Sequence, residues 1–284
     1  MSNLGARIAS ALVMAPLVIA GVLWLPGAAW PLVAAVVPAL AGHELGRLAR
    51  HAGHDVGPLV PWATYLVAAY AGIGGAPTRW VDGDGGLRAA LAIVVVAAFV
   101  VQIARPPERR SVAAWGLAVA FPAYVGGMAG YAIGLRALDD GVAWLVTLLL
   151  LVWTNDSAAY FGGRALGRHP LAPALSPKKT WEGAAVGTMA TIAVALLIAL
   201  LPAAARIGVA PHGLATAPAW QAAALGLAIA VAGPLGDLSH SFVKRQFGAK
   251  DASHLIPGHG GVWDRIDSLL FAAPVVYWAA LLVR

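Results

Sequence analysis

The chain has 284 residues, of which 60% are hydrophobic and only 11% are charged. Soluble domains are about 45–50% apolar and about 25% charged, and disordered chains need high charge, so this composition excludes both classes. The absence of cysteine excludes disulfides, thiolate nucleophiles and zinc–thiolate or iron–sulfur centres.

Apolar stretches of about 20 residues, the length that crosses a hydrocarbon core of about 30 Å, recur along the whole chain. Their apolar positions run continuously and do not alternate, which favours helices over the strands of a membrane barrel. We therefore predict an all-α fold, a polytopic integral membrane protein with about nine transmembrane helices. In chain order the predicted segments are 6–25, 28–47, 58–77, 88–105, 112–135, 141–161, 183–202, 219–240 and 265–283.

One of these segments, 112–135, carries Gly126 and Gly130 at a spacing of four. Small residues at this spacing let two membrane helices approach closely. Glycine is also frequent in membrane helices without such a contact, and the pattern alone favours this simpler explanation.

The basic residues are distributed unequally between the two sides that nine helices define. Of the 19, 14 lie on the side of the N-terminus and of the loops after the second, fourth, sixth and eighth helices. Because cytoplasmic loops carry the excess of Lys and Arg, we expect the N-terminus inside and the C-terminus outside the inner membrane. The 14 residues are Arg7, Arg47, Arg50, Arg105, Arg109, Arg110, Arg164, Arg168, Lys178, Lys179, Lys244, Arg245, Lys250 and Arg265, and the other five are Arg79, Arg88, Arg136, Arg206 and Arg284.

No long linker and no clear internal repeat divides the chain. We expect residues 1–140 to form a scaffold of N-terminal helices, with small-residue faces that would allow a homodimer. Residues 141–284 are expected to carry a site at the cytoplasmic face. The missing repeat gives no support to a transporter built from inverted repeats.

Six acidic residues lie within the apolar segments or at their cytoplasmic ends. An ionised carboxylate at membrane depth costs about 2.5–3.5 kcal/mol or more, so it needs a cation, a metal ion or a role in proton transfer. For Glu44, a salt bridge with nearby Arg47 is as good an explanation as function. For Asp237, the nearest cations are about two helical turns away, which favours function. The six residues are Glu44, Asp156, Glu182, Asp237, Asp264 and Asp267.

Most of the remaining polar chemistry lies in two stretches, 153–183 and 236–268, on the predicted cytoplasmic side. Their carboxylates suit magnesium, their Lys and Arg suit phosphate oxygens, and their Gly-rich turns let backbone N–H groups approach an anion. If a helix has begun there, Asp264 and Asp267 share one face, and Asp237 could complete the cluster. The pattern predicts a magnesium–polyphosphate site, although a transporter of an anionic substrate could use the same residue types. No basic–aromatic interleaving indicates a nucleic-acid partner.

The second stretch contains a long pattern, SFVKRQFGAKDASHLIPGHGGVWDRID at 241–267, that resembles the signature of bacterial phosphatidate cytidylyltransferases. The first stretch is similar to the same family in its NDS and SPKKTWEG segments, so the informative match covers about residues 153–283. One departure is His240, where relatives commonly carry Glu, and this change would alter the metal or pH dependence of the site. The matched signature positions are Ser241, Lys244, Arg245, Lys250, Asp251, Pro257, Gly258, His259, Gly260, Gly261, Asp264, Arg265 and Asp267.

The resemblance implies that CTP and phosphatidate are converted to CDP-diacylglycerol and pyrophosphate at the cytoplasmic membrane face. It implies Mg²⁺ as cofactor, held by Asp237 and Asp264 with Asp267 and Asp156 in support, and a monovalent cation such as K⁺ as a second ion. Lys179 joins the three aspartates Asp237, Asp264 and Asp267 as a catalytic residue. The residues expected to bind CTP (or dCTP) and phosphatidate are Asn155, Asp156, Ser157, Ser176, Lys178, Lys179, Lys244, Arg245, Lys250, His259, Gly260, Gly261 and Arg265.

Two other functions remain open at this point. One is another membrane lipid phosphotransferase, although the D-G-x2-A-R-x8-G-x3-D-x3-D pattern of CDP-alcohol transferases is absent. The other is an ion-coupled transporter that uses the membrane acids.

Overall fold

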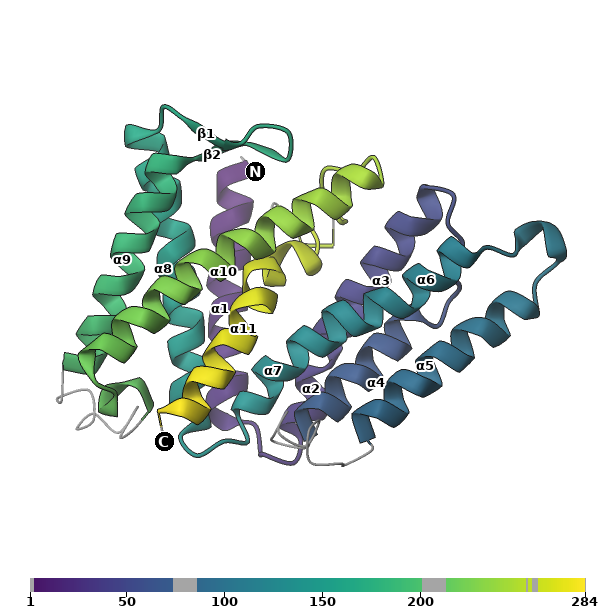
Figure 1. Cartoon of the computed structure of the whole chain (residues 1–284), viewed down its shortest axis with the longest axis horizontal. Helices are drawn as coiled ribbons and strands as arrows, with labels where there is room; N and C mark the ends of the chain where they lie inside the picture. Colours follow the sequence, from purple (N-terminus) through teal and green to yellow (C-terminus); the bar gives the residue numbers. More distant parts are fainter. Residues whose placement is uncertain (1–2, 74–85, 201–212, 254, 257–259, 284) are drawn as a thin grey trace. The chain divides into compact units, whose positions relative to one another are not determined.

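The computed structural model describes residues 3–73, 86–200, 213–253, 255–256 and 260–283, which are almost entirely helical (Figure 1). The predicted site residue His259 lies outside these ranges, as do Arg79, Arg206 and Arg284. The helices are α1 (Asn3–Trp24), α2 (Trp30–Ala34), α3 (Val36–His51), α4 (Val60–Ile73), α5 (Gly86–Ile103), α6 (Val112–Phe121), α7 (Gly127–Leu135), α8 (Gly141–Leu166), α9 (Trp181–Leu200), α10 (Ala219–Gln246) and α11 (Trp263–Leu282). Shorter elements are the 3-10 turns η2 (Pro107–Arg109) and η5 (Gly213–Thr216), the π turn η3 (Pro122–Gly126), and the strands β1 (Pro170–Ala172) and β2 (Ser176–Thr180).

Each predicted apolar segment overlaps a helix, and within the described ranges six helical stretches are long and apolar enough to cross a membrane. α1 and α5 hold shorter apolar stretches, and α4 has 14 residues. The chain is therefore a helical, multi-pass membrane protein, while the count of nine spans stays a prediction. The six stretches are Trp30–His51, Val112–Leu135, Gly141–Leu166, Trp181–Leu200, Ala219–Gln246 and Trp263–Leu282.

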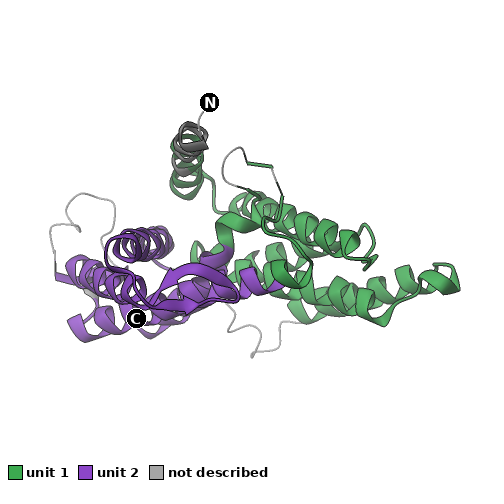
Figure 2. Ribbon diagram, turned by 90° about the horizontal axis from the view of Figure 1, so that it is seen from above, with its two compact units in different colours: residues 1–138, 244–266 green, residues 139–243, 267–284 purple. Residues whose placement is uncertain are grey.

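The chain divides into two compact units, which Figure 2 shows in different colours. The first unit consists of residues 1–138 and 244–266, and the second of residues 139–243 and 267–284. The predicted N-terminal region ends close to the first boundary. The predicted C-terminal region is divided, since its segment 244–266 belongs to the first unit.

In the first unit, the glycines of η3 and α7 pack closely against α4. A Cβ atom at Gly126 would lie 2.8 Å from the backbone oxygen of Thr64, and a Cβ at Gly130 would overlap the Cβ of Ala71. These contacts show that the small-residue spacing does mark a close helix approach, which the sequence pattern alone had not favoured. The π turn begins at Pro122, whose ring prevents a regular helical hydrogen bond at this point.

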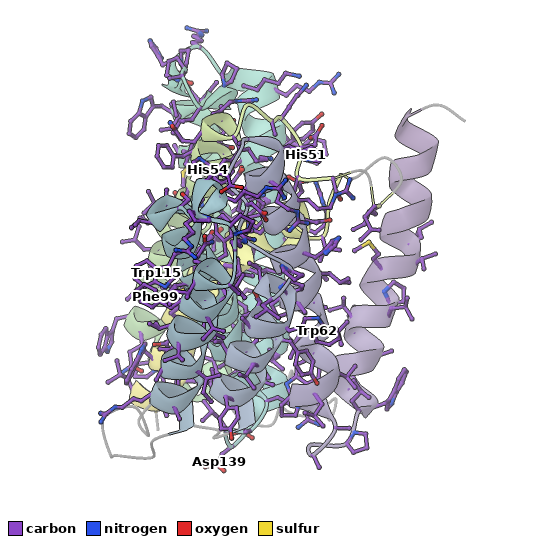
Figure 3. All side chains as sticks on the ribbon, turned by 90° about the vertical axis from the view of Figure 1, so that its right-hand side faces the viewer. His51, His54, Trp62, Phe99, Trp115 and Asp139 are labelled. Carbon is purple, nitrogen blue, oxygen red and sulfur yellow. The ribbon has the colours of Figure 1, made fainter. Side chains whose placement is uncertain are left out.

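The segment 244–266 is held in the first unit by aromatic contacts. The ring of Phe247 meets the edges of Phe121 and His54, with centroid distances of 6.2 and 6.3 Å. In the same unit, Phe99 of α5 stacks on Trp115 of α6 with a centroid distance of 4.3 Å. Both residues are labelled in Figure 3. α10 ends before Gly248, which adopts the left-handed backbone conformation common after a helix C-terminus.

In the second unit, α8 and α9 pack through small residues. A Cβ at Gly183 would lie 2.7 Å from the backbone oxygen of Ala159, and a Cβ at Gly187 would lie 2.8 Å from Oδ1 of Asn155. Because such contacts leave no room for a side chain, these glycines let the two helices lie together over several turns.

Strands β1 and β2 form an antiparallel hairpin between α8 and α9, with Pro170 opposite Thr180. This hairpin was not predicted from the sequence, because its short, proline-containing strands show no alternation of polar and apolar residues. At its end, the Thr180 hydroxyl accepts a hydrogen bond from the Gly183 N–H at 3.2 Å and so caps α9.

Candidate active site

In the first unit, Asp264 organises the loop that joins α10 to α11. Its Oδ2 accepts hydrogen bonds from the N–H groups of Ala252 at 2.9 Å and Gly261 at 2.8 Å. Its Oδ1 lies 2.8 Å from Nζ of Lys244, near the C-terminus of α10. Asp264 and Lys244, which are both predicted site residues, thus form a nearly buried ion pair. This ion pair joins the two ends of the loop.

A second carboxylate, Glu44 of α3, holds the other side of the same loop. It is only 3% exposed, and it accepts hydrogen bonds from Ser253 Oγ at 2.6 Å and from the N–H groups of Val262 at 2.9 Å and Trp263 at 2.8 Å. The two N–H groups belong to the start of α11, where helix donors lack partners and an anion is favoured. Glu44 therefore holds the loop in place through these hydrogen bonds. It does not form the salt bridge with Arg47 that the sequence allowed.

The two glycines of the signature turn that the structure describes lie directly against these carboxylates. A Cβ at Gly260 would lie 2.8 Å from Oδ2 of Asp264, and Gly260 has a φ of +82°. A Cβ at Gly261 would lie 2.5 Å from Oε2 of Glu44. The turn can close around the two acids only because both positions lack a side chain. Binding of phosphate by these glycines stays a prediction.

In the second unit, Asp237, His240 and Asp267 form a cluster of metal-binding groups. One ligand atom from each lies within 4.8 Å of the others. Asp237 and His240 are three residues apart on α10 and so share a face. A Cβ at Gly236 would lie 2.5 Å from the backbone oxygen of Asp267, so α11 lies close enough to α10 to complete the cluster.

Lys179 of β2 reaches this cluster from the hairpin. Its Nζ lies 2.6 Å from Oδ2 of Asp237, and both side chains are partly exposed. Successive residues of a strand point to opposite faces, so Lys178 points away from this contact and is exposed. The hairpin thus has a function that the sequence did not reveal, which is to place one of the two adjacent lysines beside a predicted metal ligand.

Glu182, in the first turn of α9, fixes the start of the hairpin. It accepts hydrogen bonds from the N–H groups of Arg168 at 3.0 Å and His169 at 3.2 Å, and it lies 2.5 Å from Nδ1 of His169. The only sequence signal for this role was an acid at the end of an apolar segment.

The other predicted residues have different surroundings. Asn155 is buried, and its Oδ1 accepts a hydrogen bond from Thr191 Oγ1 at 3.4 Å, so it joins α8 to α9. α11 begins at Trp263, which fulfils the condition for Asp264 and Asp267 to share a helix face. In the part of the chain that the structure describes, the cluster of metal-binding groups includes His240, and it includes neither Asp264 nor Asp156. Ser176 is half-buried, and the exposed predicted residues are Asp156, Ser157, Lys178, Arg245, Lys250 and Arg265.

Comparison with known proteins identifies the family. The sequence model of the cytidylyltransferase family matches residues 5–283. The chain belongs to this family. It is 34% identical to a phosphatidate cytidylyltransferase of Brucella suis over 279 residues, which cover 98% of this chain and 93% of that protein. It is also 31% identical to a phosphatidate cytidylyltransferase of Mycobacterium leprae, over 98% of this chain and 88% of the relative.

A further relative matches about half of the chain. The phosphatidate cytidylyltransferase of Haemophilus influenzae is 41% identical over 134 residues, which cover 47% of this chain and 44% of that protein. The family resemblance read from the signature is thereby confirmed.

Proposed function

We propose that this chain is a phosphatidate cytidylyltransferase, which joins CTP and phosphatidate into CDP-diacylglycerol and releases pyrophosphate. The observation that carries the proposal is the match to phosphatidate cytidylyltransferases over 98% of the chain. The helical membrane fold supports it, since one substrate is a lipid and the product stays in the bilayer.

The cluster in the second unit fits a divalent cation. Asp237 and Asp267 supply carboxylate oxygens, which suit Mg²⁺, and His240 supplies a nitrogen that magnesium uses less readily. We propose that Asp237 and Asp267 hold the ion, with Asp264 and Asp156 in supporting roles and a monovalent cation such as K⁺ as a second ion. When bound, Mg²⁺ supplies positive charge that offsets the charge of the triphosphate.

The lysines supply the charge that the protein itself contributes. Lys179 and Lys244 each lie within 2.8 Å of an aspartate, so each ammonium group is already oriented before substrate binds. On binding, they donate hydrogen bonds to phosphate oxygens, helped by the other basic residues of the two loops. These residues are Lys178, Arg245, Lys250 and Arg265.

The reaction needs little proton transfer from the protein. An oxygen of the phosphatidate phosphate forms a bond to the α-phosphorus of CTP, and the bond to the β-phosphate breaks as pyrophosphate leaves. Because the attacking phosphate is already ionised, the residues act mainly by positioning the two substrates and offsetting their charges. The site is proposed to face the cytoplasm, where CTP or dCTP can meet the lipid, in an inner-membrane protein that binds no nucleic acid and whose small-residue faces allow a homodimer.

An assay of the purified protein tests this proposal. With CTP, phosphatidate and Mg²⁺ the protein should release pyrophosphate and form CDP-diacylglycerol, and removal of Mg²⁺ by a chelator should stop both. Asp237→Asn should lower the rate by about tenfold to a hundredfold without unfolding the protein, whereas Glu108→Gln, at an exposed acid of η2, should leave it unchanged.

The same assay separates the alternatives. Turnover of CDP-diacylglycerol with an alcohol, but none of CTP, would identify another lipid phosphotransferase. Uptake of a solute into proteoliposomes without any nucleotide turnover would identify a transporter. Full activity of Asp237→Asn would remove this residue from the metal site.

A further inference from the structure

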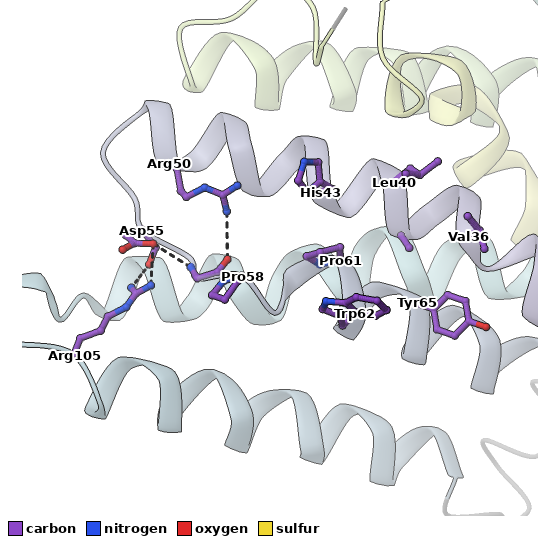
Figure 4. Close-up of a pocket in the computed structure, with 12 residues that line it drawn as sticks. Val36, Leu40, His43, Arg50, Asp55, Pro58, Pro61, Trp62, Tyr65 and Arg105 are labelled. Carbon is purple, nitrogen blue, oxygen red and sulfur yellow. Dashed lines mark hydrogen bonds and ion pairs between the residues drawn. The ribbon is translucent and has the colours of Figure 1, made fainter. Parts of the chain in front are cut away.

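A groove in the first unit is lined by none of the predicted site residues. It has a volume of about 820 Å³ and runs along α3 and the start of α4, with the loop between them at one end (Figure 4). Its lining comes from α3, from residues 55–58 and from α4, together with Arg105 beyond the end of α5. None of these residues belongs to the loops to which we assign catalysis.

The groove changes from apolar to charged along its length. Val36, Leu40, His43 and Arg50 share one face of α3, at spacings of four, seven and fourteen from the first. Figure 4 shows Arg50 and Arg105 at one end and Val36 at the other. At 1.5 Å per residue, the α3 face is about 21 Å long from Val36 to Arg50, which is the depth of one hydrocarbon leaflet of about 15 Å plus a headgroup layer.

The charged end carries a net positive charge. Nη2 of Arg105 lies 2.8 Å from Oδ1 of Asp55, and Nη1 of Arg50 donates to the backbone oxygen of Gly57 at 3.3 Å. The lining at this end thus contains two guanidinium groups and one carboxylate. Each guanidinium has five N–H donors, so these contacts leave donors for the oxygens of a phosphate ester.

The apolar part of the groove has exposed side chains. Trp62 is 72% exposed and Leu40 is 41% exposed, and both line the groove. A hydrocarbon chain packed against them fills a surface that the first unit itself leaves uncovered.

We propose that this groove binds a phospholipid with an anionic headgroup as a retained lipid and not as a substrate. Its phosphate lies at Arg50 and Arg105, and one acyl chain lies along Val36, Leu40 and Trp62. The groove combines a net positive end with an apolar part as long as one leaflet is deep, and this combination favours an anionic phospholipid. A zwitterionic phospholipid binds less well, because the two arginines do not attract its choline group. The proposal does not depend on the assignment of the catalytic residues.

Native mass spectrometry of the full chain in detergent tests the proposal, with phosphatidylglycerol or phosphatidylcholine added as the probe. Wild-type protein should retain one phosphatidylglycerol in preference to phosphatidylcholine. Arg50→Gln should lower this preference about fivefold, the effect of about one basic contact. Leu40→Trp, which fills the groove and leaves its charges intact, should lower retention of both lipids. Asp55→Asn removes the competing carboxylate and should not lower retention of phosphatidylglycerol.

Arg109→Gln is the matched control, since Arg109 is exposed but does not line the groove. An equal loss in Arg109→Gln and Arg50→Gln would show diffuse surface charge and overturn the site. Equal retention of the two lipids by the wild type would overturn the headgroup preference. A wild-type dimer that Leu40→Trp dissociates would show that a second copy of the chain occupies the groove. Thermal unfolding establishes whether each variant is folded. If Arg50→Gln is not folded, lipid retention by Leu40→Trp and Asp55→Asn tests the proposed site instead.

Discussion

At the scale of single residues, the acids of this chain act mainly by ordering backbone. Glu44 and Asp264 accept four backbone hydrogen bonds between them, from Ala252, Gly261, Val262 and Trp263. A buried carboxylate with this many donors is stabilised as an anion, and the loop that supplies the donors is fixed in return. A loop held in this way can present its basic residues to substrate with little loss of conformational entropy.

Glu44→Gln should therefore impair substrate binding by the loop. The carboxamide has one oxygen, so its NH2 group would face a backbone donor and leave it unpaired at a cost of about 1–3 kcal/mol. We expect kcat/KM for CTP to fall about tenfold or more, chiefly through KM, at temperatures where the protein stays folded. Glu44→Asp keeps two acceptor oxygens and should recover part of this loss. Steady-state kinetics with CTP, alongside thermal unfolding, measures both effects.

Glu108→Gln, at an exposed acid outside the loop, is the control for loss of one charge. If Glu44→Gln lowered only the unfolding temperature and left KM for CTP unchanged, Glu44 would be a stabilising residue and not a positioning one.

The role of Glu44 also shows where a sequence stops being informative. Its depth in an apolar segment indicated that it needs a partner, but Ser253 lies 209 residues away and Trp263 lies 219 residues away. Periodicity reports which face of a helix is buried and says nothing about which distant segment covers it. The signature residues of 241–267 were predicted because they are close together in the chain, and they belong to a long motif.

At the scale of elements, apolar length was enough to locate every predicted helix, because a membrane span needs about 20 apolar residues whatever surrounds it. The hairpin at 170–180 gave no such signal, since its strands of three and five residues are too short for a period of two to be seen. The packing of helices against each other depends on single glycines, whose effect can be measured.

Gly126→Ala should destabilise the packing of η3 against α4. The new methyl group would lie 2.8 Å from the backbone oxygen of Thr64, which cannot move without shifting α4. Overpacking of this kind costs about 1–3 kcal/mol, so the unfolding temperature in detergent should fall. Gly127→Ala is the matched control, because nothing lies within 4 Å of its Cβ position. An equal effect of the two substitutions would mean that helix propensity, and not this contact, sets the stability.

At the scale of the whole molecule, the number of spans decides on which side of the membrane each loop lies. Nine spans place the two termini on opposite sides, whereas the six stretches that are long enough in the described ranges would place them on the same side. The distribution of 14 basic residues on one side against five on the other favours nine spans, because a chain with nine spans has its basic loops in the cytoplasm. Helices α1, α4 and α5 must then cross as well, and a span of fewer than 18 residues needs a locally thinner bilayer or flanking residues that extend to the interface.

The absence of cysteine allows a test of this topology without background labelling. Single cysteines at exposed positions, Ala137→Cys, Glu108→Cys and Ala174→Cys, lie between α7 and α8, in η2 and in the hairpin. A membrane-impermeant maleimide should label Ala137→Cys in intact spheroplasts, and should label the other two variants only after permeabilisation. The reason is that Glu108 and Ala174 lie in loops whose neighbouring arginines and lysines are held on the cytoplasmic side. Labelling of Ala174→Cys from outside would place the hairpin and its Lys179 on the wrong side of the membrane for cytoplasmic CTP, and would contradict both the nine-span topology and the proposed location of the active site.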